Sequence, residues 1–388
     1  DELARAPPDL SVAGIRRQWA TALRATGVAR IGELVVDDRI FDRSPHPAGW
    51  PLEQYGNGYC AETWGLNANR NMIDLVAVGR GGSVALELAP DYGLRVVRNT
   101  ASVRPKSKYS IAVARPIDSN DLTVRGTLDR DRSSPLGLTV HDTPSLVAAL
   151  AARILESAGV EVASHRLARP DDPAPVGRVL EPVHATPIAT VLERANTDSE
   201  NLYAEALLKR LGAAASNASG AAPGGEGWIA GSWANGCDAL RSGLTRRLGE
   251  ESIRAWRTVD GSGLARDNRV DAHGTCRWLA SFAREPGLAP SYFGSFAIAG
   301  RTGTVRRRFQ TLEDSPVEVR CKTGYIRGVS CLSGLAIGPG GRAIAFSVLG
   351  NGLEAGDRVS RAKALQEAIV LRVVEELTPP PATAPKGR

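Results

Sequence analysis

Lysine and cysteine are both scarce in this sequence. Only six of its 48 basic residues are lysine and the other 42 are arginine, a balance that points to genomic base composition before chemistry. The five cysteines are dispersed, without a Cys-x-x-Cys pair and without histidines at metal-ligand spacing, so we expect no zinc site and no cofactor. Cys321 and Cys331 are predicted to be small buried apolar residues.

Long hydrophobic runs are absent as well. No apolar stretch approaches the ~18 residues that a membrane helix requires, so we expect no membrane span. The length of 388 residues, with 43% hydrophobic and 23% charged residues, is typical of a globular protein with two or three cores. The net charge of +6 favours an anionic partner, such as nucleic acid or an acidic wall polymer. Because no basic patch is interleaved with aromatic residues, we do not expect nucleic acid.

The two ends of the chain carry few structural signals. The first eight residues contain no initiator methionine, no basic region and no apolar region, so we expect that a leader has been removed or that the chain is a fragment. The proline-rich residues 379–388 are predicted to be disordered.

The first half of the chain reads as helix followed by strands. Apolar residues at four-residue spacing predict a helix over residues 12–24, and residues 31–38 read as a strand and turn. Short β-branched segments then predict a β-rich module, with strands at 73–78, 84–88, 94–97, 111–113 and 122–128. The glycine-rich residues 79–83 join two of these strands and lack the helix and Lys-Ser/Thr of a phosphate loop, so we expect a hairpin turn.

Helical patterns return in the middle of the chain and a sheet follows. Helices are predicted at 145–155, 188–194 and 202–211, with a connecting segment at 170–187 and a mobile surface loop at 212–227. An antiparallel sheet is expected from strands near Lys322, at 329–337 and at 343–349. We expect an amphipathic helix at the end of the chain to cover one face of this sheet. Its apolar side is formed by Ala362, Leu365, Ile369, Val373 and Leu377.

The triplet Lys322-Thr323-Gly324 lies on an apolar strand and is the strongest chemical signal. Lysine there can hold a substrate carboxylate, Gly324 leaves room for a peptide backbone, and the amide of Tyr325 can donate to an oxyanion. Side chains alternate along a strand, so Thr323 points to the other face unless the strand twists. The alternative is a purely structural strand with lysine at its rim. A rival triplet, Arg301 to Gly303, leads into a basic run that suits a turn or helix start better.

A second motif, Ser199-Glu200-Asn201, stands where a loop ends and a helix begins. Serine and asparagine are good helix caps, so capping is the alternative to a catalytic role. Together with Lys-Thr-Gly, however, Ser-x-Asn is one of the three motifs of penicillin-recognising serine enzymes, the third being Ser-x-x-Lys.

The sequence around these motifs resembles the D-alanyl-D-alanine carboxypeptidase/endopeptidase family of low-molecular-weight penicillin-binding proteins. Members of that family carry a long insertion after the nucleophile motif. The resembling segments are 32–42, 47–51, 197–208, 260–266, 303–309 and the block around Lys322. The resemblance implies that Ser199 shuttles a proton, Asn201 binds the peptide, and Lys322 with Thr323 grips the terminal carboxylate. It also implies an oxyanion hole completed by the amide of Tyr325.

The nucleophile motif of that family is not found where the resemblance expects it. About thirty residues precede the first resembling segment and none of them forms Ser-x-x-Lys. The one Ser-x-x-Lys, Ser360 to Lys363, lies after Lys-Thr-Gly at a helix start, where we expect a cap. Asp260-Gly-Ser-Gly-Leu264 is out of register for a nucleophile elbow and is predicted to be a tight turn. His184 and His273 are expected to be structural.

The resemblance implies an α/β (α+β) fold: a DD-peptidase/β-lactamase-like domain whose antiparallel sheet is covered by helices, with an inserted β-rich region. We expect an N-terminal helical segment at 1–30, the insertion at 31–140, the peptidase domain at 141–378 and the tail. The implied function is a serine-type carboxypeptidase of the periplasm or cell envelope, with peptidoglycan stem peptides and β-lactams as partners. Because the Ser-x-x-Lys motif that carries the nucleophile is missing, we expect this chain to be inactive. The alternatives are a non-catalytic wall-binding or scaffold protein and β-lactamase-like hydrolysis, for which no deacylating glutamate is placed.

Overall fold

The computed structural model describes residues 12–129, 135–180, 185–354 and 356–378, so the predicted disordered tail lies outside the described residues. The chain forms two compact units. The first compact unit holds Asp1–Ala185 and Leu208–Gly236, and the second holds Thr186–Leu207 and Cys237–Arg388. Residues 141–185 group with the β-rich region in this division. The predicted domain boundaries at residues 30 and 140 stay predictions.

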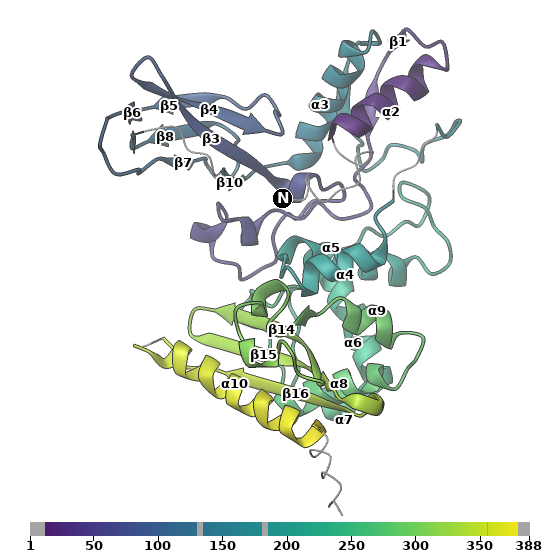
Figure 1. Cartoon of the computed structure of the whole chain (residues 1–388). Helices are drawn as coiled ribbons and strands as arrows, with labels where there is room; N and C mark the ends of the chain where they lie inside the picture. The colour runs from purple at the N-terminus through teal and green to yellow at the C-terminus, as the bar shows by residue number, and fades with distance from the viewer. Residues whose placement is uncertain (1–11, 130–134, 181–184, 355, 379–388) are drawn as a thin grey trace, which may run out of the picture. The chain divides into compact units, whose positions relative to one another are not determined.

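The first compact unit is built mainly from short strands (Figure 1). Its helices are α2 (Val12–Arg24) and α3 (Thr143–Ser157), with 3-10 turns η1 (Leu52–Gln54), η2 (Gly58–Cys60) and η3 (Asn69–Asn71). Its strands are β1 (Arg30–Ile31), β2 (Leu34–Val36), β3 (Met72–Arg80), β4 (Ser83–Ala89), β5 (Val96–Asn99), β6 (Ser102–Val103), β7 (Ala112–Ala114), β8 (Leu122–Arg125), β9 (Thr127–Leu128), β10 (Leu136–Thr139), β11 (Glu161–Val162) and β12 (His165–Leu167). They form sheets in the orders β10-β3-β4-β6-β9, β5-β8-β7, β1-β11 and β12-β2.

The glycine-rich segment at 79–83 closes a hairpin between β3 and β4. Arg80 pairs with Ser83, and the two residues between them, Gly81 and Gly82, have φ of +57° and +84°. Left-handed backbone at both positions of a two-residue turn matches the twist of the flanking strands and is cheapest for glycine. The predicted hairpin is confirmed.

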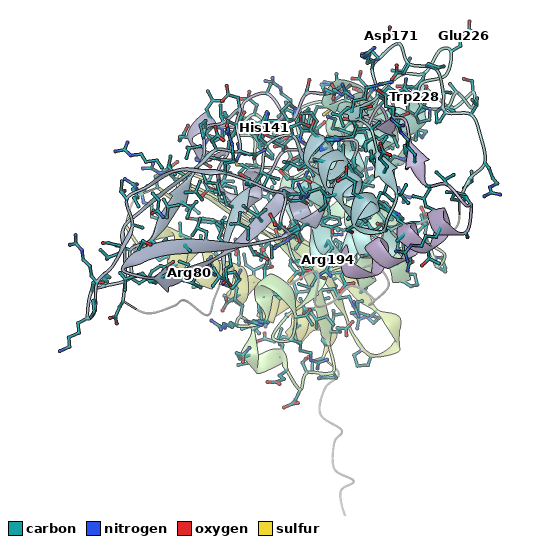
Figure 2. The ribbon with its side chains drawn as sticks, turned by 90° about the horizontal axis from the view of Figure 1, so that it is seen from above. Arg80, His141, Asp171, Arg194, Glu226 and Trp228 are labelled. Carbon is teal, nitrogen blue, oxygen red and sulfur yellow. The ribbon has the colours of Figure 1, made fainter. Side chains whose placement is uncertain are left out.

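Alternation along β3 builds the core of this unit. Ile73, Leu75 and Ala77 are buried on one face, and apolar residues of α3 pack against the first two. A buried carboxylate, Glu62, lies beside this core. Its oxygens accept from the indole of Trp64 at 2.8 Å and contact Nδ1 of His141, labelled in Figure 2, at 2.8 Å.

The second compact unit carries the predicted C-terminal sheet. Its helices are α4 (Ile188–Asn196), the start of α5 (Asn201–Ser216), most of α6 (Trp233–Leu248), α7 (Glu250–Ile253), α8 (Ala272–Ala283), α9 (Ala289–Gly294) and α10 (Arg358–Leu377). Its strands are β13 (Ala297–Ile298), β14 (Glu318–Ile326), β15 (Val329–Ile337) and β16 (Ala343–Gly350), with 3-10 turns η4 (Gly303–Val305), η5 (Gln310–Leu312) and η6 (Pro339–Gly341). The strands form one antiparallel sheet in the order β13-β14-β15-β16.

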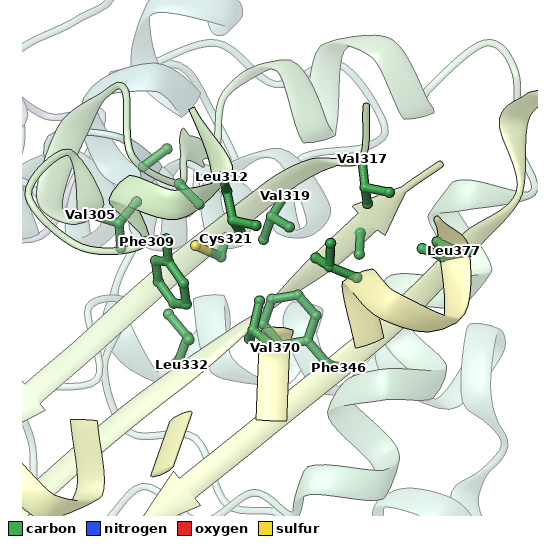
Figure 3. Close-up of a cluster of buried hydrophobic side chains, with 14 residues drawn as sticks. Val305, Phe309, Leu312, Val317, Val319, Cys321, Leu332, Phe346, Val370 and Leu377 are labelled. Carbon is green, nitrogen blue, oxygen red and sulfur yellow. The ribbon is translucent and has the colours of Figure 1, made fainter. Parts of the chain in front are cut away.

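The two faces of this sheet bury different segments. On one face, Val319 and Cys321 of β14 pack with Val370 of α10 and with residues of the 305–312 segment (Figure 3). On the other face, Leu335 of β15 packs with Phe293 and with aromatic residues of α8 and α9. Since side chains alternate, Lys322 lies on the α8 face and Thr323 nominally on the α10 face.

The last helix is confirmed, and of its predicted apolar face Val373 and Leu377 pack against the core, whereas Leu365 and Ile369 do not. Leu365 and Ile369 are 58% and 37% exposed, whereas Gln366 and Val370, one residue further on, are buried. The Gln366 amide donates to the carbonyl and hydroxyl of Ser330, at 3.1 and 3.3 Å, so a polar residue faces the sheet because β15 supplies its partners. An apolar stripe alone does not reveal such a rotation of about one residue.

The predicted loop at 212–227 was wrong at its beginning, since α5 continues to Ser216. A Cβ on Gly212 would lie 2.0 Å from Oδ1 of Asn235, so the glycine marks a close approach of α6 rather than a flexible turn. Asn217 then exchanges hydrogen bonds with Ile229, closing the loop.

No helix in the described ranges is long and apolar enough to cross a bilayer. Within the same ranges no group of three or more His, Cys, Asp or Glu side chains is arranged to hold a metal ion.

Candidate active site

The site is built on the edge of β14. Residues Glu318 to Ile326 pair with β15 along one side, whereas β13 pairs only with Arg320 and Cys321 on the other. Among the described strands, the stretch from Lys322 to Ile326 therefore has one open edge. An open strand edge presents backbone donors and acceptors to which an extended peptide can add.

The ammonium group of Lys322 crosses this edge and meets the Ser-x-Asn motif. Nζ donates to Oγ of Ser199 at 2.6 Å and to the carbonyl oxygen of Thr323 at 2.7 Å. Both acceptors are neutral, and Lys322 forms no ion pair with any carboxylate in the described part of the chain. Burial without an opposite charge disfavours the charged form and lowers the pKa of Lys322 to about 8.

Ser199 has a strained backbone, with φ of +61°. A non-glycine residue in the left-handed region persists only where its surroundings hold it there. Here the preceding residues are tied down: Thr197 Oγ1 donates to the carbonyl oxygen of Ser295 at 2.6 Å, and Arg194, labelled in Figure 2, pairs with Asp198 at 2.7 Å. After it, the Glu200 amide donates to the Arg194 carbonyl at 3.0 Å.

The Ser199 hydroxyl thus accepts from Lys322, a contact that helix capping does not require. Asn201 is the first residue of α5, two positions beyond the serine. The structure brings Ser199 and Lys322 together across 123 positions of sequence.

The remaining residues of the Lys-Thr-Gly block lie further along the same edge. Thr323 Oγ1 is 2.8 Å from Oγ1 of Thr304. Gly324 is exposed, and a Cβ there would make only an ordinary 3.4 Å contact with Cys331, so packing within the sheet does not demand glycine. Tyr325 is 64% exposed, and the Lys363 ammonium lies 5.7 Å from its ring centroid.

The rival triplet at Arg301 turns out to be a partner of the first. Gly303 and Thr304 begin the 3-10 turn η4, as the basic run after them predicted, and Thr304 reaches Thr323. Sequence reasoning treated the two triplets as competitors and missed Thr304. The available signal was a second Thr-Gly segment shortly before the Lys-Thr-Gly strand.

Among the described residues, no hydrogen bond joins the other nucleophile-like segments to the ammonium group of Lys322. Ser360 and Lys363 are exposed on α10. The predicted tight turn at Asp260 is confirmed, because its carboxylate accepts from the amides of Gly263 and Ala265. His273 lies near the start of α8, and His184 lies outside the described residues.

Comparisons with known proteins identify the family of this chain. A family model described as the D-Ala-D-Ala carboxypeptidase 3 (S13) family matches residues 3–372. The D-alanyl-D-alanine carboxypeptidase of Actinomadura sp. (strain R39) is 27% identical, over 96% of this chain and 68% of that protein. The carboxypeptidase DacB of Haemophilus influenzae is 26% identical, over 88% of this chain and 69% of that protein.

A solved structure extends the likeness to the fold. The crystal structure of penicillin-binding protein 4 from Haemophilus influenzae superposes with a TM-score of 0.72 at 22% identity, covering 95% of this chain and 80% of that one. The predicted α/β (α+β) fold class is confirmed by this likeness and by the mixed helices and sheets.

Proposed function

Because the chain belongs to the D-Ala-D-Ala carboxypeptidase 3 (S13) family, we propose that it acts on the D-alanyl-D-alanine ends or cross-links of peptidoglycan by serine-type hydrolysis. Relatives that bear the name carboxypeptidase match over most of the chain, which favours an enzyme over a wall-binding scaffold. Such a substrate places the action of the protein in the cell envelope.

The observation that carries the proposal is the partly buried charge of Lys322. Among the described residues, its ammonium has only the neutral oxygens of Ser199 and Thr323 as partners, at 2.6 and 2.7 Å. A partly buried cation without a counterion is costly unless an anion arrives to pair with it. The free carboxylate at the end of a stem peptide supplies that anion, and the same charge suits the carboxylate of a β-lactam.

The open edge of β14 suits the rest of such a peptide. Backbone groups from Lys322 to Tyr325 can pair with an extended chain, and Gly324 leaves space where a side chain would meet it. In the roles that the resemblance implies, Asn201 binds the peptide and the amide of Tyr325 stabilises the oxyanion that forms during acyl transfer.

The pair Ser199 and Lys322 provides a proton path. In acyl transfer a hydroxyl attacks the carbonyl carbon of the scissile bond, and the departing D-alanine nitrogen must gain a proton. An amine with a pKa of about 8 stands 2.6 Å from the Ser199 hydroxyl, so this hydroxyl can pass a proton to the leaving nitrogen and be reprotonated. We assign no nucleophile among the described residues, since Ser360 and Lys363 are exposed on α10.

Noncovalent binding tests the proposal without requiring a nucleophile. An acetylated tripeptide ending in D-alanyl-D-alanine is titrated into the chain by calorimetry, beside the same peptide with a carboxamide end. We expect the acid to bind at least about tenfold more tightly than the amide, because a charge-assisted hydrogen bond is lost in the amide.

Lys322→Met should abolish this preference, whereas Lys108→Met, the same change at an exposed lysine, should keep it. Equal affinities of the wild-type chain for the acid-ended and the amide-ended peptide would refute the proposed function.

A further inference from the structure

The turn at Gly303 and Thr304 touches both halves of the proposed site. A Cβ on Gly303 would lie 2.4 Å from the carbonyl oxygen of Thr197, two residues before Ser199. With φ of +56°, this position needs glycine for space and for backbone conformation alike. The next residue, Thr304, meets Thr323 beside Lys322. One turn therefore links the serine loop to the Lys-Thr-Gly strand.

The segment that carries Thr304 is firmly anchored. Val305 and Phe309 are buried in the core between β14 and α10 (Figure 3). Arg308 donates to Oε1 of Glu367 at 2.7 Å and to Oε1 of the buried Gln366 at 3.2 Å. Thr304 itself is exposed, so its hydroxyl does not need Thr323 as a substitute for water. The contact of 2.8 Å is instead set by the anchored segment.

Two hydroxyl groups in contact have a limited number of protons to donate to a ligand. Each hydroxyl has one proton, and one of the two protons is used between Thr304 and Thr323. If Thr304 donates to Thr323, the proton of Thr323 is left for an acceptor near Lys322, and donating while accepting strengthens both bonds. A carboxylate held by the Lys322 ammonium is such an acceptor.

We propose that Thr304 is a positioning residue for carboxylate recognition: it donates to Thr323 Oγ1 and so directs the Thr323 hydroxyl proton to the terminal carboxylate of the substrate. This inference rests on the proposed function and adds a residue to it. Thr304 acts through Thr323 and does not itself touch the substrate, so its effect depends on Thr323 being present.

The test compares Thr304→Val with Thr304→Ser and with the control Thr311→Val, an exposed threonine in the same segment. Valine keeps the shape and removes the hydroxyl. We expect Thr304→Val to lower the affinity for the acid-ended tripeptide about fivefold to tenfold and to leave the affinity for the amide-ended peptide unchanged. Thr304→Ser should restore the acid affinity to within about twofold, and Thr311→Val should change neither affinity.

A double-mutant cycle then separates positioning from a merely structural bridge. Because Thr304 acts through Thr323, the double variant Thr304→Val/Thr323→Val should lose no more affinity than Thr323→Val alone. Additive losses, or an equal weakening of acid and amide by Thr304→Val, would overturn the inference.

The wild-type chain separates this failure from failure of the proposed function. If wild type prefers the acid and Thr304→Val keeps the full preference, only the role of Thr304 is wrong. If wild type shows no preference, both proposals fall. Melting temperatures measured on every variant identify a loss of affinity that is due to unfolding.

Discussion

Lys209 of the first compact unit and Lys322 of the second put the same side chain in opposite circumstances. Lys209 is fully buried, yet its ammonium pairs with the Asp42 carboxylate at 2.6 Å, donates to the carbonyl oxygens of Asp42 and Ser44, and lies 4.2 Å from the Trp233 ring centroid. Lys322 is less buried, and its acceptors are one hydroxyl and one carbonyl.

The difference separates a structural charge from an available one. The charge of Lys209 is neutralised within its own unit, so it has nothing left to attract a ligand. The charge of Lys322 meets neutral oxygens, and burial accordingly lowers its pKa to about 8. A partly buried cation without a counterion among the described residues is what the proposed carboxylate site requires.

The largest effect on stability is expected from Lys209→Met. The change leaves Asp42 without its cation and two carbonyl oxygens without their donor, so we expect a loss of about 3 kcal/mol in the free energy of unfolding. Urea unfolding measures it as a lower midpoint at an unchanged slope. The control Lys108→Met should stay within about 0.5 kcal/mol of wild type, and an equally small effect at Lys209 would contradict its structural role.

Lys322→Met should behave in the opposite way. The pKa of Lys322 is about 8 in the folded chain and 10.5 in its reference state, so between these pH values the unfolded chain binds more protons. The stability of wild type relative to Lys322→Met should therefore rise by about 2 kcal/mol as the pH increases from 7 to 10. Urea unfolding of both proteins at several pH values shows this, and a difference that falls with pH would be evidence of an anionic partner.

Ligand binding should follow the protonation of the same amine. Only the ammonium form attracts a carboxylate, so affinity for the acid-ended tripeptide should fall about tenfold as the pH rises from about 8 to 10. The bound carboxylate itself favours the charged form, so the decline begins near the pKa of about 8 of the free chain and ends at the higher pKa of the complex. Lys322→Arg stays charged throughout, and any affinity that it retains should be independent of pH. Calorimetric titration at each pH distinguishes the two proteins.

The smallest expected effect concerns the partner of Lys322. Ser199 has φ of +61°, where a side chain costs energy and glycine does not. We expect Ser199→Gly to be more stable than Ser199→Ala by about 1 kcal/mol, since both lack the hydroxyl and only alanine keeps the strain. The melting temperatures of the two variants measure it. If the alanine variant were the more stable, the strain at Ser199 would be absent.

Much of the second compact unit could be predicted from the sequence because its signals are local. Alternating apolar residues and glycine-rich turns mark β14, β15 and β16, and in the first compact unit the hairpin at Gly81 likewise needs only two adjacent glycines. The resemblance gave Ser199 and Lys322 separate roles in one site, and the structure shows Oγ of Ser199 and Nζ of Lys322 at 2.6 Å.

The failures share one cause, which is a partner distant in sequence. Gln366 turns inward because Ser330 of β15 offers it two acceptors, and this displaces the apolar Leu365 to the surface. Position 212 of α5 is a glycine because Asn235 approaches too closely for a side chain. The proposed role of Thr304 depends on its contact with Thr323, which its own segment does not reveal. No periodicity within any of these segments reports such contacts.

The sequence by itself determined the strands of the C-terminal sheet, several of the helices and the residue types that can bind a carboxylate, because propensity and alternation act over a few neighbouring residues. Only the tertiary structure decided which lysine is neutralised and which remains available. That outcome depends on the distance from each ammonium group to an acid: Asp42 lies at 2.6 Å from Lys209, while Ser199 and Thr323 give Lys322 only neutral oxygens.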